Sequence, residues 1–143
     1  MAIDLDTKPI VAMRHRPGPC GDAPEMILLL EKVSRIVNVG TVAADKGYHS
    51  KAIRIFIWND LKAEPQIHLW KRDRRKPTAT KLTRLRQLKI FDEEKYHRWA
   101  LVETVHSVLK RSMRGDDLAR DPSSQRIDLG LRVGAYNSNR FEN

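Results

Sequence analysis

An apolar, β-branched run from Val39 to Ala44 lies between two stretches with helical spacing, and this alternation constrains the fold most. The run has the length of a buried strand and ends at Asp45. The stretch before it opens with the capping-box pattern of Asp22 to Glu25 and continues to about Ile36. Its expected apolar face is Leu28, Leu29, Val33 and Ile36. The stretch after it, from about Ser50 to Ala63, is expected to bury Ile53, Phe56, Ile57 and Leu61.

The rest of the chain completes a mixed α/β pattern. Ala2–Asp6 and Ile10–His15 are short β-rich runs separated by a turn, which predicts a hairpin, and Gln66–Trp70 is a further strand. One helix is expected from about Glu93 to Met113, with negative charge at its start in Asp92–Glu94. Asp121 and Pro122 open a last helix that runs to about Asn139. The sequence therefore predicts one mixed α/β domain over residues 1–143.

Composition excludes several classes of protein. The longest apolar run, Met26–Leu30, is far too short to span a bilayer, and the N-terminus lacks the layout of a signal peptide. The single cysteine, Cys20, excludes an intramolecular disulfide framework. A cytoplasmic protein without a membrane partner is therefore expected. The 27 Lys and Arg against 18 Asp and Glu give a net charge of +9, which suggests a nucleic-acid partner, although a solvated basic face gives the same count.

The basic charge is concentrated between Lys71 and Lys89, where nine of 19 residues are basic and only Asp73 is acidic. Clustered Arg and Lys side chains supply the phosphate contacts that dominate DNA affinity. We therefore expect a DNA-binding role for the residues at its start, Arg72, Arg74, Arg75 and Lys76. A solvated loop followed by a basic helix start is the alternative.

The helix expected at 93–113 has a polar stripe. Glu103 lies opposite the apolar face of this helix. Tyr96 and Lys110 stand seven residues before and after Glu103, and seven residues fall only 20° short of two full turns, so the three side chains share one stripe. An ordinary amphipathic surface helix would show the same pattern. Together with Asp45 at a strand end, Glu103 supplies the carboxylate oxygens that Mg²⁺ or Mn²⁺ prefers. A strand-end Asp alone is more often a turn or cap residue.

These segments resemble a known family. Val42–Tyr48, which reads Val-Ala-Ala-Asp-Lys-Gly-Tyr, resembles the segment around the second catalytic Asp of DDE transposases from insertion sequences. Tyr96, Glu103 and Lys110 match the spacing of the family's third-acid signature of Tyr, Arg, Glu and Lys. Val108–Arg111 and Ala135–Asn137 are similar to the end of the family's domain.

The resemblance implies an RNase H-like mixed sheet with flanking helices, and metal-dependent cleavage and transfer of DNA strands. Asp45 and Glu103 would be the second and third catalytic acids and would bind Mg²⁺ or Mn²⁺. The DNA-binding residues would then include Tyr96, Arg98, Lys110 and Arg111. The implied partner is DNA, both transposon ends and target, in a nucleoid-associated protein. A homodimer is possible but is not required by the resemblance.

Two departures from the family stand out. Trp99 occupies the position of the family's Arg, with Arg98 beside it. The family's first catalytic Asp lies on a strand upstream of the hairpin matched by residues 2–15. An N-terminally truncated transposase that is inactive alone is therefore the first expectation. The alternatives are a non-catalytic DNA-binding remnant that competes for transposon ends and, sharing the fold, an RNase H-like nuclease or resolvase.

Overall fold

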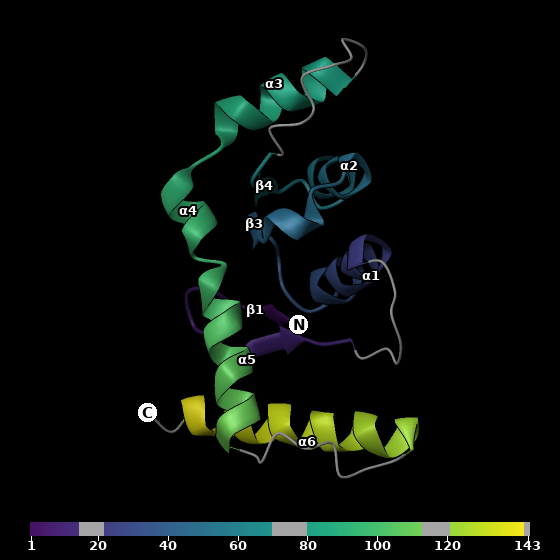
Figure 1. Ribbon diagram of the computed structural model, residues 1–143, viewed down its shortest axis with the longest axis vertical. Helices are drawn as coiled ribbons and strands as arrows, with labels where there is room; N and C mark the ends of the chain where they lie inside the picture. The colour runs from purple at the N-terminus through teal and green to yellow at the C-terminus, as the bar shows by residue number, and fades with distance from the viewer. Residues whose placement is uncertain (15–21, 70–79, 113–120, 142–143) are drawn as a thin grey trace. The chain divides into compact units, whose positions relative to one another are not determined.

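The computed structural model describes residues 1–14, 22–69, 80–112 and 121–141 as a mixed α/β structure with small sheets and several helices (Figure 1). The chain divides into two compact units. One unit is Gly21–Trp99, and the other combines Met1–Cys20 with Ala100–Asn143. We call them the central unit and the terminal unit and describe each by itself. Among the described residues, no helix is both long and apolar enough to cross a membrane.

The central unit is built on two parallel strands, β3 and β4, that pair Ala43 with Gln66 and Ala44 with Ile67. Helices α1 and α2 lie on one side of this pair and α4 on the other (Figure 1). Its elements in chain order are α1 (Asp22–Ser34), β3 (Thr41–Ala44), the short 3₁₀ helix η1 (Lys46–Tyr48), α2 (Lys51–Asn59), β4 (Glu64–Ile67), α3 (Thr80–Ile90) and α4 (Glu93–His97).

The core of the central unit confirms the expected α2 face. Ile53 and Ile57 are fully buried against Ile67, and Phe56 and Leu61 pack at the edge of this core. The expected face of α1 is confirmed only at Val33, because the helix buries Val33 together with Met26 and Leu30, which lie seven and three residues before it. Leu28 is 40% exposed, and Ile36 is 58% exposed because α1 ends at Ser34. The side chain of Asp22, expected to cap α1, lies outside the described residues.

Strand β4 begins two residues earlier than the expected strand at 66–70 and ends at Ile67. It includes Pro65, which has no N–H to donate and is tolerated because each strand of a two-stranded sheet has an outer edge. Trp70 lies outside the described residues. As expected, Asp92 starts the next helix: its Oδ1 accepts hydrogen bonds from Glu94 N (2.9 Å) and Lys95 N (3.1 Å).

The terminal unit contains the expected hairpin, with shorter strands. β1 (Ala2–Ile3) and β2 (Ile10–Ala12) are antiparallel, and Asp4 Oδ1 stabilises their turn by accepting bonds from Asp6 N and Thr7 N. The helices of this unit are α5 (Ala100–Ser112) and α6 (Pro122–Phe141). The start of α6 agrees with the expectation, because Asp121 accepts bonds from Ser123 N and Ser124 N. The core of the unit is Ile10, Val105, Leu109 and Tyr136.

The Ala-Tyr-Asn segment of α6 has a structural role in this unit. Tyr136 is buried, and Asn137 bonds the backbone of β2 with both ends of its carboxamide. Oδ1 accepts from Ile10 N (2.9 Å), and Nδ2 donates to Ile10 O (3.0 Å). The side chain therefore takes the place that a neighbouring strand would occupy along this edge.

The single helix expected at 93–113 is two helices, so that expectation is wrong. α4 ends at His97 and α5 begins at Ala100. Between them Trp99 N donates to Tyr96 O (3.1 Å), an i→i+3 bond that closes a tight turn instead of continuing the α-helix. Tyr96 therefore belongs to the central unit, whereas Glu103 and Lys110 belong to the terminal unit.

Candidate metal and DNA-binding residues

Asp45 lies immediately after β3 and is exposed. It stands at the first position before η1, yet its side chain makes no capping hydrogen bond there. Its backbone O accepts from Tyr48 N (3.0 Å), which closes the turn that displays the carboxylate. The Asp45 side chain therefore does not act as a helix cap. Its position, at the carboxyl end of a parallel strand, is one where α/β sheets place functional groups.

Tyr96 lies beside Asp45 in the same unit, and α4 packs against both β3 and β4. The phenol oxygen accepts hydrogen bonds from the Lys46 backbone N–H and from the Trp99 indole. The ring contacts His68 and Phe91 at centroid distances of 5.6 and 5.5 Å, and Trp99 at 6.4 Å. With 9% of its surface exposed, Tyr96 is part of an aromatic cluster and presents little of its ring to solvent.

Burial and, second, the negative charge of Asp45 raise the pKa of Tyr96 above its usual value of 10.0. The two hydrogen bonds to its oxygen act in the opposite direction and are weaker in sum. Tyr96 therefore keeps its proton at neutral pH. Because its folded pKa is raised, its contribution to stability is complete below about pH 10 and is lost as the pH rises through the folded pKa.

Asp45→Asn is expected to lower the pKa of Tyr96, because the substitution removes the carboxylate charge that disfavours the phenolate. Alkaline titration of phenolate absorbance measures this shift, and Tyr96→Phe identifies the Tyr96 transition among those of Tyr48 and Tyr136. Asp60→Asn, which removes an exposed carboxylate at the end of α2, is the control for loss of one carboxylate. An unchanged Tyr96 transition in Asp45→Asn would contradict the electrostatic effect of Asp45 on Tyr96.

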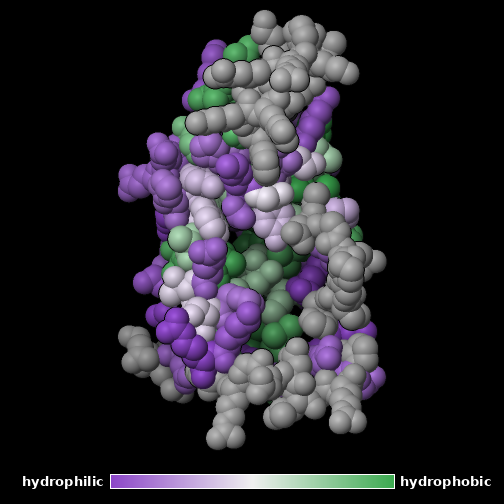
Figure 2. All heavy atoms as spheres, viewed as in Figure 1, coloured by the Kyte–Doolittle hydropathy of each residue, from purple (hydrophilic) through white to green (hydrophobic). Residues whose placement is uncertain are grey.

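Glu103, Lys110 and Arg111 are all exposed on α5, opposite the buried Val105 and Leu109. Figure 2 shows hydrophilic side chains along α5 on the face it presents. The Glu103–Lys110 part of the expected stripe thus lies on one helix. Arg111 donates to Ser107 Oγ from Nε (3.0 Å) and Nη2 (2.7 Å), which holds its guanidinium along the helix.

Arg98 and Trp99 form the turn between α4 and α5. Arg98 is exposed, whereas Trp99 is half-buried and donates to the Tyr96 oxygen. The Trp99 indole is thus a hydrogen-bond donor to Tyr96.

Arg72, Arg74, Arg75 and Lys76 lie outside the described residues. The described end of the basic segment is on α3, where the Arg86 guanidinium lies 4.6 Å from the centroid of the Trp58 ring. This cation–π contact joins α3 to α2.

The donor chemistry of Asp45 and Glu103 fits a hard divalent cation, because both offer exposed carboxylate oxygens. They come from different units. Among the described residues, no group of three His, Cys, Asp or Glu side chains gathers in an arrangement that could hold a metal ion.

Two residues near Asp45 were missed by the sequence reasoning. His68 follows Ile67, the partner of Ala44, so Asp45 and His68 both directly follow paired residues at the ends of neighbouring strands. Gln66 is fully buried and bonds the segment between α3 and α4. Both residues lie within the expected strand at 66–70, and their two-residue spacing on one face of that strand was the available signal.

Comparison with known proteins identifies one family. The model of the transposase DDE domain matches residues 1–138. No curated protein and no solved structure is significantly similar to the chain. Because the match covers nearly all of the 143 residues, the chain belongs to the transposase DDE domain family.

Proposed function

We propose that this chain supplies Asp45 and Glu103 as metal-binding acids for cleavage and transfer of DNA strands in an RNase H-like core. The observation that carries the proposal is the exposed Asp45 carboxylate, which ends a parallel strand beside Tyr96 and caps no helix. Membership of the transposase family supports this reading. Family enzymes act on DNA, and the net charge of +9 suits that partner.

Each side chain has a defined role in the proposal. Asp45 and Glu103 bind Mg²⁺ or Mn²⁺, and when bound the ion supplies positive charge that offsets the charge developing on the scissile phosphate. Tyr96 holds its proton on its phenol oxygen at neutral pH and so offers a hydrogen-bond donor rather than a repelling phenolate. Lys110, Arg111 and Arg98 are exposed cations that bind the phosphates flanking the cut.

We further propose that the 143-residue polypeptide is inactive alone. Asp45 and Glu103 are the only residues assigned to the metal, and two carboxylates leave most ligand positions of a two-metal site without a protein group. Asp4 is a poor third acid, because its Oδ1 already accepts two backbone bonds in the hairpin turn. Asp6 is exposed in the same turn, and we assign it no role in metal binding.

The test measures Mn²⁺ binding and DNA nicking separately. Mn²⁺ affinity is expected to fall about tenfold or more in Asp45→Asn and in Glu103→Gln, because each loses a charged ligand. Neither the chain nor its variants is expected to nick a plasmid that carries the element's ends. Glu64→Gln, in an exposed ion pair with Lys95, is the matched control and should keep its Mn²⁺ affinity. Nicking that disappears in Asp45→Asn would refute inactivity, and an unchanged Mn²⁺ affinity in both variants would refute the metal site.

A second candidate is a non-catalytic DNA-binding protein that competes for transposon ends. The observation that favours it is the concentration of nine basic residues between Lys71 and Lys89. Its DNA affinity should not depend on Asp45 or on divalent metal. Binding that requires both would favour the first candidate.

A further inference from the structure

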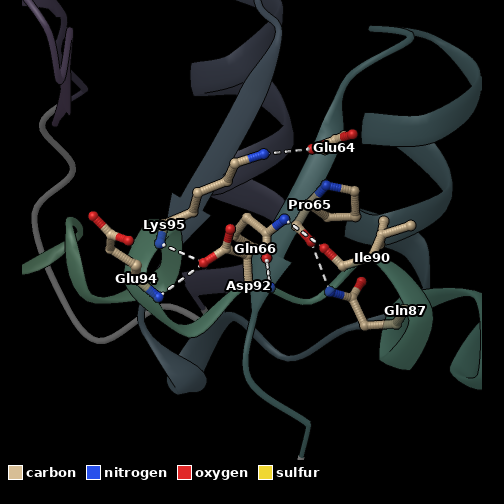
Figure 3. Close-up of polar contacts among 8 residues, drawn as sticks. All are labelled: Glu64, Pro65, Gln66, Gln87, Ile90, Asp92, Glu94 and Lys95. Carbon is tan, nitrogen blue, oxygen red and sulfur yellow. Dashed lines mark hydrogen bonds and ion pairs between the residues drawn. The ribbon is translucent and has the colours of Figure 1, made fainter.

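The carboxamide of Gln66 joins the sheet of the central unit to the end of α3 and the start of α4. Gln66 is fully buried on β4, and both ends of its side chain bond main-chain groups on either side of Phe91 (Figure 3). Nε2 donates to Ile90 O (2.8 Å), and Oε1 accepts from Asp92 N (2.9 Å). The uncharged carboxamide supplies both a donor and an acceptor, so it can bond both main-chain groups.

The residue that Gln66 binds determines where α4 starts. Asp92 Oδ1 accepts from Glu94 N and Lys95 N, and Asp92 O accepts from Tyr96 N (2.9 Å). Asp92 is therefore both cap and first acceptor of α4, and Tyr96 lies one turn beyond it. The Lys95–Glu64 ion pair (3.2 Å) also connects α4 to β4, but both side chains are about half exposed, so it adds little.

Strand register relates Gln66 to Asp45. Gln66 pairs with Ala43 on β3, and Asp45 follows this strand two residues after Ala43. Residues two apart on a strand point to the same face, and α4 packs on β3 and β4. On this face Lys46 N–H donates to the Tyr96 oxygen, and the Tyr96 ring contacts His68.

We propose that Gln66 is a positioning residue that holds α4 on the β3–β4 pair so that Tyr96 stays beside Asp45. The inference rests on the proposed role of Asp45 as a metal ligand. An apolar side chain of equal size would fill the space, but it would leave Ile90 O and Asp92 N without these partners in a partly buried place. The start of α4 would then be free to move relative to the strands.

Gln87 provides a matched comparison. It is also fully buried, and its Nε2 donates to Pro65 O (2.6 Å), so it joins α3 to the residue before Gln66 (Figure 3). Its Oε1 is buried without a hydrogen-bond partner among the described residues. Gln87→Met thus removes an equally buried amide that bonds the same strand from α3, and it leaves the bonds of Asp92 and α4 in place.

The experiment follows amide hydrogen exchange of Lys46, whose N–H reports the contact with Tyr96. In Gln66→Met this exchange is expected to accelerate about tenfold relative to the α2 amides of Ile53 and Ile57, the effect of two lost hydrogen bonds. Gln87→Met should leave the ratio unchanged. Tyr96→Phe, which removes the acceptor, gives the upper limit. Gln66→Glu at low pH, where the buried carboxyl is neutral and has both donor and acceptor, should restore slow exchange.

Mn²⁺ affinity is the second readout and should fall in Gln66→Met but not in Gln87→Met. Unchanged Lys46 exchange in Gln66→Met, or equal acceleration at Lys46 and in α2, would overturn the inference. A third result would also overturn it: Gln66→Met exchanges Lys46 faster but keeps its Mn²⁺ affinity, while Asp45→Asn loses Mn²⁺ affinity. If Asp45→Asn also keeps its Mn²⁺ affinity, the proposed metal site fails, and the exchange data still decide whether Gln66 positions Tyr96.

Discussion

Replacing Arg72, Arg74 and Arg75 together by alanine is expected to lower DNA affinity on the order of 100-fold at about 50 mM salt. These residues lie in the segment that holds nine of the chain's 27 basic residues. If each arginine contacts one phosphate, the slope of log affinity against log salt becomes shallower by about 2.7. Titrating a labelled duplex at several salt concentrations measures both effects.

The control for this triple variant removes the same charge elsewhere. Lys32, Arg35 and Lys51 are exposed on or near α1 and α2, far from residue 71 in sequence. Their joint replacement by alanine should change the salt slope much less. Equal losses in the two triple variants would mean that net charge alone, and not the basic segment, binds DNA.

Asn137→Ala is expected to destabilise the terminal unit by about 2–3 kcal/mol, because it leaves both Ile10 N and Ile10 O without their partner. Ile10 is 4% exposed, so water replaces these bonds poorly. Chemical denaturation followed by circular dichroism measures the loss. Amide hydrogen exchange at Ile10 shows whether the loss of stability begins at β2.

Two further variants test the origin of that loss. Asn137→Asp keeps the acceptor for Ile10 N but cannot donate to Ile10 O when ionised, so exchange at Ile10 should stay slower than in Asn137→Ala. Ser138→Ala, an exposed position on the same helix, should cost little. A loss in Ser138→Ala as large as in Asn137→Ala would assign the effect to α6 helicity rather than to the hydrogen bonds of Asn137.

The sequence predicted the parts of the fold that depend on local pattern. Val42 and Ala44 alternate with less buried residues and lead to Asp45, and that strand end is where the structure has it. The match to the transposase DDE domain confirms the family that the segments around Asp45 and Glu103 indicated.

What the sequence did not predict depends on contacts between distant residues. Helical periodicity runs through 93–113, but the contacts of Trp99 with Tyr96 end the helix, and periodicity carries no sign of them. Gln66 looked like an ordinary polar residue at the start of a strand. Its importance comes from Ile90 and Asp92, at least 24 residues away. Burial of a polar side chain by such partners has no local signature.

The Asn137–Ile10 pairing also sets an order of events during synthesis. The central unit is one continuous stretch, Gly21–Trp99, whose partners leave the ribosome close together. The β1–β2 hairpin leaves the ribosome before the central unit, but Asn137, which bonds Ile10 of the hairpin, follows 127 residues later. Until α6 is made, the edge of β2 has unpaired backbone groups that can pair with other nascent chains. A chain that ends before residue 137 therefore lacks the partner of Ile10, and its β1–β2 hairpin is expected to be prone to aggregation.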